Sequence, residues 1–321
     1  MPPVPRIMKA AAIDRFGPPE VLEVHELPVP DVEPKEVLIA VHTAGVGSWD
    51  AQMRGGWWPE GRPTFPVVLG TDGSGTIAKV GSAVAGFKEG DSVYAYSFLN
   101  PNGGFYAEYV CVPATNVGHK PLRLGLEEAG AIGTTGLTAL QGVERLGLRK
   151  GSLVAVVGAS GGVGTLAVQF ARWMGLKLFA VASGADGVKL VNGLVGVDVA
   201  VDGKHDDVGA AAARFAPDGL DGVLAFAGGS SLDECVANVK NGGRVVYPNG
   251  VEPEPKKRRG IEIVSYDAEP GLEQFERLNS AVDEAKLKVP VAARFPLAEA
   301  SRAHERTESG HVIGKIVLSI R

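Results

Sequence analysis

The segment 153–164, LVAVVGASGGVG, constrains the fold more than any other part of the chain. A short run rich in valine leads directly into a glycine-rich turn, and an apolar segment with helical spacing follows. The spacing Ala-x-Gly-x-x-Gly is that of a dinucleotide-binding turn with alanine in the first glycine position. Small residues let the backbone approach a diphosphate, and free N–H groups at the start of the next helix bind its negative charge. The expected binding residues are Ala159, Ser160, Gly161, Gly162, Val163 and Gly164.

Strand and helix patterns alternate in the region from residue 126 to residue 286. Such alternation requires right-handed crossovers, which make the sheet parallel. Residues 1–125 instead carry short alternating apolar segments separated by proline and glycine, and strand-like patterns return in residues 287–321. We therefore predict an α/β fold in which a Rossmann doubly wound parallel sheet (126–286) is inserted into a β-rich domain (1–125 and 287–321).

Composition argues against several classes of protein. The chain has a net charge of −5, which favours neither nucleic acid nor an anionic membrane as a partner. Its two cysteines, Cys111 and Cys235, cannot form a disulfide framework or a multi-cysteine zinc site. Neither a signal peptide nor a long apolar run is visible, so we expect a cytoplasmic protein. The basic cluster at 256–259 (KKRR) is expected to be a solvated loop.

Several short segments spread over the chain resemble, in their sequence and in their order, those of a known family. They are 45–56 (GVGSWDAQMRGG), 66–75 (PVVLGTDGSG), 80–94 (VGSAVAGFKEGDSVY), 104–110 (GFYAEYV), 135–139 (TGLTA), 159–170 (ASGGVGTLAVQF), 242–246 (GGRVV) and 314–318 (GKIVL). In this order they resemble the medium-chain dehydrogenase/reductase superfamily, and within it the zinc-free quinone oxidoreductases. The resemblance implies that the β-rich part is a GroES-like catalytic domain.

The zinc prediction follows from individual positions. Zinc-dependent relatives carry a cysteine in the segment matching 45–50 and a His-Glu pair at the positions of Thr71 and Asp72. Neither is present here, and the six histidines are scattered without ligand-like spacing. A catalytic zinc needs three protein ligands around an open position, so we predict no metal.

The choice of nicotinamide cofactor depends on the end of the second strand of the nucleotide-binding region. An acid usually stands there to bind the ribose 2′-hydroxyl of NAD. Here the position holds Ser183, which tolerates a phosphate. Lys189 lies downstream to neutralise the charge. Zinc-free relatives often carry a tyrosine near position 203, where this chain has Gly203, and Lys204 is a substitute for that tyrosine. Asp186 would serve NADH instead if its loop folds back. We predict NADPH rather than NADH.

The resemblance implies hydride transfer to a quinone or an α,β-unsaturated carbonyl, without zinc. The nicotinamide ring is expected near the carboxyl ends of the strands, and the cofactor contacts predicted there and in the TGLTA segment are Phe226, Ala227, Asn249, Gly250 and Thr138. The predicted substrate pocket is lined by Ser48, Trp49, Trp58 and Tyr96, whose aromatic rings would stack on a flat acceptor.

The substrate side of the chain departs from the family pattern. Many quinone reductases carry Asn and two Tyr where this chain has Gly47, Gln52 and Trp58. No catalytic residue is assigned. Asp50 and Tyr247 are the candidates, but Asp50 also fits a role in holding its loop, Tyr247 fits a packed strand position, and solvent is an alternative proton donor.

Two other functions remain open from the sequence. One is an enoyl-thioester reductase, and the other is a non-enzymatic NADPH-binding protein with a structural or regulatory role, because fold alone does not establish function. The family resemblance also implies a homodimer and a small electrophilic molecule as the partner.

Overall fold

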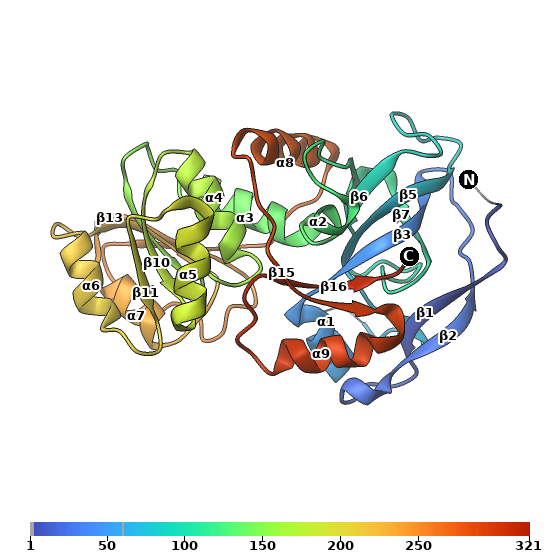
Figure 1. Cartoon of the computed structure of the whole chain (residues 1–321), viewed down its shortest axis with the longest axis horizontal. Helices are drawn as coiled ribbons and strands as arrows, with labels where there is room; N and C mark the ends of the chain where they lie inside the picture. Colours follow the sequence, from blue (N-terminus) through green and yellow to red (C-terminus); the bar gives the residue numbers. More distant parts are fainter. Residues whose placement is uncertain (1–2, 60) are drawn as a thin grey trace. The chain divides into compact units, whose positions relative to one another are not determined.

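The computed structural model describes residues 3–59 and 61–321, which form two compact units (Figure 1). The first unit comprises Met1–Thr134, Pro270–Asn279 and Val291–Arg321, and the second comprises Thr135–Glu269 and Ser280–Pro290. Among the described residues, no helix is long and apolar enough to cross a membrane. The division into domains at residues 126 and 287 stays a proposal.

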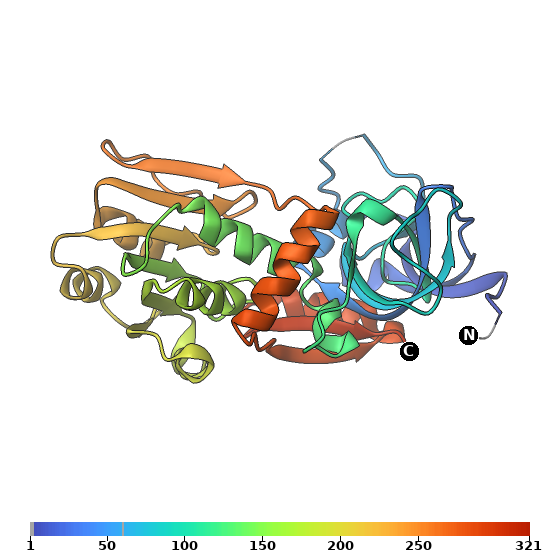
Figure 2. The same cartoon turned by 90° about the horizontal axis from the view of Figure 1, so that it is seen from above.

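The second unit is built on a six-stranded sheet in the order β11-β10-β9-β12-β13-β14, with β14 at one edge (Figure 2). Every neighbouring pair is parallel, which confirms the predicted doubly wound sheet. The central strands are almost continuous runs of valine, alanine and leucine, since helices cover both faces of such a sheet. The strands are β9 (Leu153–Val157), β10 (Lys177–Ala182), β11 (Val199–Asp202), β12 (Leu220–Ala225), β13 (Val239–Pro248) and β14 (Glu262–Tyr266).

Helices connect these strands, and they pack in pairs, α4 on α5 and α6 on α7. Helix α6 begins where the Asp207 carboxylate accepts a hydrogen bond from the Ala210 N–H at 2.8 Å. Helix α5 ends at Gly196, which has a left-handed backbone. The helices from residue 126 to residue 284 are α2 (Leu126–Gly130), α3 (Gly133–Arg145), α4 (Gly164–Trp173), α5 (Gly184–Val195), α6 (Val208–Phe215), α7 (Ser230–Ala237) and α8 (Leu272–Glu284).

The first unit contains a three-stranded sheet, β2-β1-β4, and a seven-stranded sheet, β15-β16-β3-β5-β6-β8 with β7 paired to β3. All pairs are antiparallel except β15 with β16. Because β16 pairs with β3, the end of the chain returns to the β-rich unit, as predicted. The strands are β1 (Ile7–Ile13), β2 (Leu22–Pro28), β3 (Glu36–Val46), β4 (Val67–Val68), β5 (Asp72–Val80), β6 (Ser92–Tyr96), β7 (Tyr109–Pro113), β8 (Val117–His119), β15 (Val291–Pro296) and β16 (Lys315–Ser319).

Two helices of this unit were not expected from the sequence: α1 (Ser48–Gly55) and α9 (Ala300–Glu308). They pack against each other (Figure 1). Helix α1 begins where Asp50 accepts a hydrogen bond from the Gly47 N–H at 2.7 Å. An ion pair of 2.6 Å between Arg54 and Glu308 links the two helices.

Gly75 marks the tightest approach between β5 and β3. A β-carbon there would lie 2.1 Å from the carbonyl oxygen of Ala40. We expect Gly75→Ala to lower the free energy of unfolding by about 1–3 kcal/mol, because the strands must move apart. Gly193 in α5 has open space around its α-carbon, so Gly193→Ala should raise the free energy of unfolding by about 0.5–1 kcal/mol. Urea unfolding measures the free energy of unfolding of both variants, and values equal to that of the wild type would contradict the prediction.

Candidate active site

The turn after β9 is held tightly against the neighbouring strands. Gly158 has a φ of +78°, and a β-carbon there would lie 3.1 Å from the β-carbon of Ala227. The N–H groups of Gly158 and Ala159 both donate to the carbonyl oxygen of Val181, at 3.1 and 3.0 Å. The turn is therefore fixed to the end of β10 and lies beside the residues that follow β12.

Two glycines of this turn have different roles. A β-carbon on Gly164 would lie 2.1 Å from the Gly158 carbonyl oxygen, so only glycine lets α4 start this close to β9. A β-carbon on Gly161 would have one neighbour within 4 Å, the Gly158 oxygen at 3.5 Å. One side of the turn is thus crowded and the other is open. An open glycine at the start of a helix fits the diphosphate of a dinucleotide.

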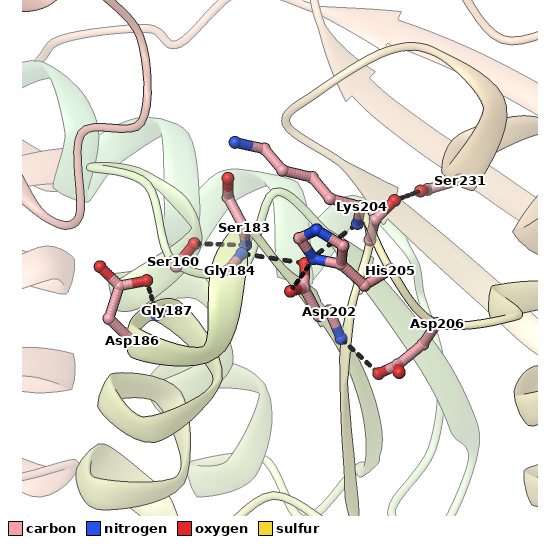
Figure 3. A network of polar contacts seen from close by, with 11 residues as sticks. Ser160, Ser183, Gly184, Asp186, Gly187, Asp202, Lys204, His205, Asp206 and Ser231 are labelled. Atoms are coloured by element: carbon pink, nitrogen blue, oxygen red, sulfur yellow. Dashed lines mark hydrogen bonds and ion pairs between the residues drawn. The ribbon is translucent and has the colours of Figure 1, made fainter.

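The ends of β10 and β11 are joined by a network of polar contacts (Figure 3). The hydroxyl of Ser160 accepts a hydrogen bond from the Ser183 N–H at 3.0 Å. Asp202, which the sequence did not single out, ends β11, and its Oδ1 accepts from the N–H groups of Gly184 (2.9 Å) and Lys204 (3.0 Å).

The charge of Asp202 is stabilised by these donors. Its Oδ2 accepts a hydrogen bond of 2.8 Å from Nδ1 of His205. The hydrogen bonds from His205 and from the Lys204 and Gly184 N–H groups lower the pKa of Asp202 to about 2. Asp202 is therefore an anion that ties the two turns together, with both oxygens occupied by protein donors.

The residues predicted to choose between NADPH and NADH lie at different places relative to Ser183. The exposed side chain of Lys204 extends toward the hydroxyl of Ser183 (Figure 3). Lys189 lies in the second turn of α5 and is exposed. Asp186 lies on the far side of Gly184, where it accepts a hydrogen bond from the Gly187 N–H at 2.9 Å (Figure 3). Lys204 is thus the lysine that this network brings to Ser183.

The predicted contacts of the nicotinamide ring follow neighbouring strands. The Phe226 N–H donates to the Val157 carbonyl at 2.9 Å, so Phe226 and Ala227 lie beside the glycine-rich turn. Asn249 and Gly250 follow β13, the next strand, where Asn249 donates to Asp267 at 2.8 Å.

Thr138 and Tyr247 have largely structural surroundings. Thr138 is buried in α3, and its carbonyl oxygen accepts a hydrogen bond of 2.6 Å from the Tyr266 hydroxyl. Tyr247 is part of the apolar core of the second unit, and burial raises its pKa.

In the first unit, Trp49, Thr71 and Asp50 form a buried chain of hydrogen bonds. Trp49 Nε1 donates to the Thr71 hydroxyl at 2.8 Å, and that hydroxyl donates to Asp50 Oδ1 at 3.0 Å. Asp50 is 1% exposed. Burial raises its pKa to about 6, although the hydrogen bond from Gly47 and the Lys315 ammonium act in the opposite direction.

A second series of hydrogen bonds links Asp50 to α9. Arg54 Nη1 lies 3.3 Å from His304 Nδ1, and His304 Nε2 lies 3.2 Å from the Tyr106 hydroxyl. That hydroxyl donates to Asp50 Oδ2 at 3.4 Å. Burial lowers the pKa of His304 to about 3, so the imidazole is neutral at pH 7. No local pattern in the sequence marks these hydrogen bonds, because Arg54 and His304 are 250 positions apart.

A cavity of about 840 Å³ opens in the same unit. Most of its lining comes from three segments, within residues 27–31, 63–71 and 97–104. Thr71 and the predicted pocket residue Trp58 line it, whereas Ser48, Trp49 and Tyr96 are not among its lining residues. Its volume suits a small organic molecule, and its lining is mainly apolar.

The donors in the described part of the chain do not fit a zinc ion. No three His, Cys, Asp or Glu side chains among the described residues are placed to hold a metal. The Thr71 hydroxyl and the Asp50 carboxylate already bind each other. Cys111 and Cys235 are buried free thiols, whose pKa values burial raises to about 12.

Part of the basic cluster at 256–259 is occupied by structural contacts. Lys256 forms an ion pair of 2.6 Å with Asp233, and Arg258 donates to the carbonyl oxygens of Val236 (2.7 Å) and Val239 (2.5 Å). Arg258 thus satisfies one carbonyl group at the end of α7 and one at the start of β13.

Two family models match the chain. Residues 33–122 match the alcohol dehydrogenase GroES-like domain, and residues 195–318 match a model described as zinc-binding dehydrogenase. Among curated relatives, a 2-methylene-furan-3-one reductase of Solanum lycopersicum is 31% identical over 98% of this chain and 80% of its own length. An NADPH-dependent alkenal/one oxidoreductase of Arabidopsis thaliana is 30% identical with the same coverage. The quinone oxidoreductase of Mus musculus is 29% identical over 98% of both chains.

Solved structures show the same fold over 98% of this chain. The quinone oxidoreductase of Coxiella burnetii superposes with a TM-score of 0.87 at 29% identity and is covered completely. A mycobacterial protein complexed with NADPH gives 0.85 at 26% identity, also completely covered. An NAD-dependent alcohol dehydrogenase gives 0.89 at 32% identity, again completely covered.

Because the turn is open at Gly161, we predict that a substitution there weakens dinucleotide binding without affecting folding. The protein has room for a methyl group at Gly161, so Gly161→Ala should fold normally, but the methyl would occupy the surface that a diphosphate approaches. We expect the Kd for a nicotinamide dinucleotide to rise about tenfold or more, because one or more charge-assisted hydrogen bonds to the diphosphate would be lost. Fluorescence titration measures the Kd, with Gly193→Ala as the matched control. Unchanged affinity in Gly161→Ala would contradict this role of the turn.

Proposed function

This chain belongs to the medium-chain dehydrogenase/reductase family and is similar to its quinone oxidoreductases, and from that premise we propose that it is an NADPH-dependent, zinc-independent reductase of quinones or α,β-unsaturated carbonyls. Relatives named for quinones, alkenals and a methylene-furanone support this class of acceptor. In each of these acceptors a carbonyl is conjugated to a carbon–carbon double bond. An electron-poor carbon of this kind accepts hydride without a Lewis acid.

The observation that carries the proposal is the glycine-rich turn, crowded at Gly164 and open at Gly161. The N–H groups at the start of α4 would hold the diphosphate of the cofactor. Reduced nicotinamide, when bound, supplies a hydride. The protein's contribution is to bind and orient the cofactor and the acceptor and to exclude water from the site.

The adenosine end of the cofactor is the basis for proposing NADPH. Ser183 and Lys204 would bind the 2′-phosphate, one through a hydroxyl and the other through its charge. The carboxylate that ends β11, Asp202, has its oxygens bound to Gly184, Lys204 and His205. It is therefore not arranged to accept a hydrogen bond from a ribose 2′-hydroxyl, which is what an NAD site requires.

Turnover of a small panel of acceptors tests the proposal. We expect NADPH to bind more tightly than NADH, and to be oxidised in the presence of 1,4-benzoquinone, 9,10-phenanthrenequinone or a 2-alkenal. Fluorescence titration measures binding, and NADPH absorbance measures turnover. Tight binding with no oxidation by any acceptor would contradict the reductase and favour a protein that only binds NADPH.

A separate prediction concerns which lysine would bind the 2′-phosphate. Lys204→Ala should raise the Kd for NADPH about tenfold, the loss of one charge-assisted hydrogen bond, and leave the Kd for NADH unchanged. Lys189→Ala is the matched control, since it removes the same charge from α5. A larger effect at Lys189 than at Lys204 would assign the phosphate to Lys189 and contradict the role given to Lys204.

A homodimer in the cytoplasm, with a small electrophilic acceptor as the substrate, completes the proposal. The relatives' names support the acceptor class, while sedimentation would test the dimer.

A further inference from the structure

We infer that the hydroxyl of Thr71 delivers the proton that completes reduction of the acceptor, and that Asp50 supplies this proton to Thr71. The inference rests on the proposed function, because hydride transfer to a conjugated carbonyl leaves an anion that must be protonated. Thr71 lines the cavity of about 840 Å³, whereas Asp50 lies behind it, 1% exposed. Thr71 would therefore be the catalytic residue, and Asp50 would act through it.

The hydrogen bonds around Asp50 decide which of its oxygens carries the proton. Oδ2 accepts from the Gly47 N–H at 2.7 Å, a donor that cannot reverse, and from the Tyr106 hydroxyl at 3.4 Å. The direction in which the Tyr106 hydroxyl donates is set by the two residues before it in this series of hydrogen bonds, His304 and Arg54. The Arg54 guanidinium can only donate, so it makes His304 Nδ1 the acceptor.

Neutral His304 then carries its hydrogen on Nε2 and donates it to Tyr106, which in turn donates to Asp50. The hydrogens of Arg54, His304 and Tyr106 thus all run toward Asp50, and Oδ2 accepts the last of them, that of the Tyr106 hydroxyl. Oδ1 faces only the Thr71 hydroxyl among the hydrogen bonds of the described residues, so Oδ1 is the oxygen that can be protonated.

Protonation of Asp50 changes the direction of the Thr71 hydroxyl. A threonine hydroxyl has one hydrogen and two acceptor positions. While Asp50 is ionised, the Thr71 hydrogen lies on Oδ1. When Oδ1 is protonated, it donates to Thr71, whose second acceptor position is already filled by Trp49 Nε1. The Thr71 hydrogen must then point away from both, and a carbonyl oxygen bound in the cavity can accept it.

The charges around Asp50 keep both protonation states accessible near neutral pH. Burial raises the pKa of Asp50 to about 6, and the neighbouring Asp72 carboxylate acts in the same direction. The Gly47 N–H, the Thr71 hydroxyl and the Lys315 ammonium oppose it. Lys315 is 5% exposed, and its ammonium lies 5.0 Å from the centre of the Trp49 ring. A carboxylic acid in this range suits general acid catalysis.

In an α,β-unsaturated ketone, the β-carbon would gain a hydride, with both electrons, from reduced nicotinamide, which would itself be oxidised. The carbon–carbon π bond shifts, and the carbonyl oxygen becomes an enolate oxygen. That oxygen takes the proton of Thr71 Oγ1 while Thr71 takes the proton of Asp50 Oδ1. The products are the neutral enol, which tautomerises to the saturated ketone, and ionised Asp50, which water reprotonates.

Two variants of Thr71 test the inference. Thr71→Val has the same shape without the hydroxyl, and we expect it to lower kcat about 100-fold, within the range of general acid catalysis, with little change in KM. Thr71→Ser keeps the hydroxyl and should restore most of the lost rate. Thr115→Val, at an exposed position outside the cavity, is the matched control. Thermal unfolding shows that each variant is folded.

The pH dependence of kcat separates catalysis from packing. A general acid works while protonated, so wild-type kcat should be highest below pH 6 and fall as the pH rises through the pKa of Asp50, about 6. Thr71→Val should abolish this fall, as should Asp50→Asn. A wild-type rate and an unchanged pH profile in Thr71→Val would overturn the inference and leave the reductase in place.

A measurement that needs no turnover keeps the two proposals distinct. The infrared carbonyl band of a protonated carboxylic acid should appear in the wild type as the pH is lowered and be missing in Asp50→Asn. It should shift in Thr71→Val, because the hydrogen bond from Oδ1 is lost. A band that Thr71→Val does not move would contradict the Asp50–Thr71 pair even if the enzyme is active. A wild type that reduces no acceptor would contradict the proposed function instead.

Discussion

At the end of β9 the chain passes so close to the first turn of α4 that a β-carbon on Gly164 would lie 2.1 Å from the Gly158 oxygen. This contact fixes the angle at which the helix leaves the sheet. It therefore also fixes the direction of the N–H groups at the helix start, which would bind the cofactor diphosphate. The bonds from Gly158 and Ala159 to the Val181 carbonyl extend the same constraint to β10, where the adenosine end of the cofactor would be chosen.

Two carboxylates in this protein have opposite surroundings, and so they have different uses. Asp202 is surrounded by donors that favour its charged form and lower its pKa to about 2. It holds two turns together, and both of its oxygens already accept hydrogen bonds from the protein. Asp50 lies in a site where burial dominates and raises its pKa to about 6. A group that changes charge near neutral pH can move a proton, whereas one that stays ionised cannot.

Local patterns in the sequence predicted the parallel sheet, the glycine-rich turn and the return of the chain to the β-rich unit. Each depends on residues close together or on the fixed period of strands and helices. Helix α9, with the sequence ASRAHERTE, was missed because few of its residues are apolar. The contacts of Asp202 with Gly184 and of Arg54 with His304 join residues 18 and 250 positions apart. No local pattern marks such pairs, because they exist only once the chain has folded.

Hydrogen exchange of the backbone amides, with and without NADPH, tests most directly whether the cofactor binds where the turn is open. We expect NADPH to slow exchange at residues 159–164, 183–184 and 203–205, and NADH to have a smaller effect at 203–205. The turn and the two strand ends would then be the binding surface. NADPH binding that leaves exchange in these segments unchanged would contradict the assignment of the site.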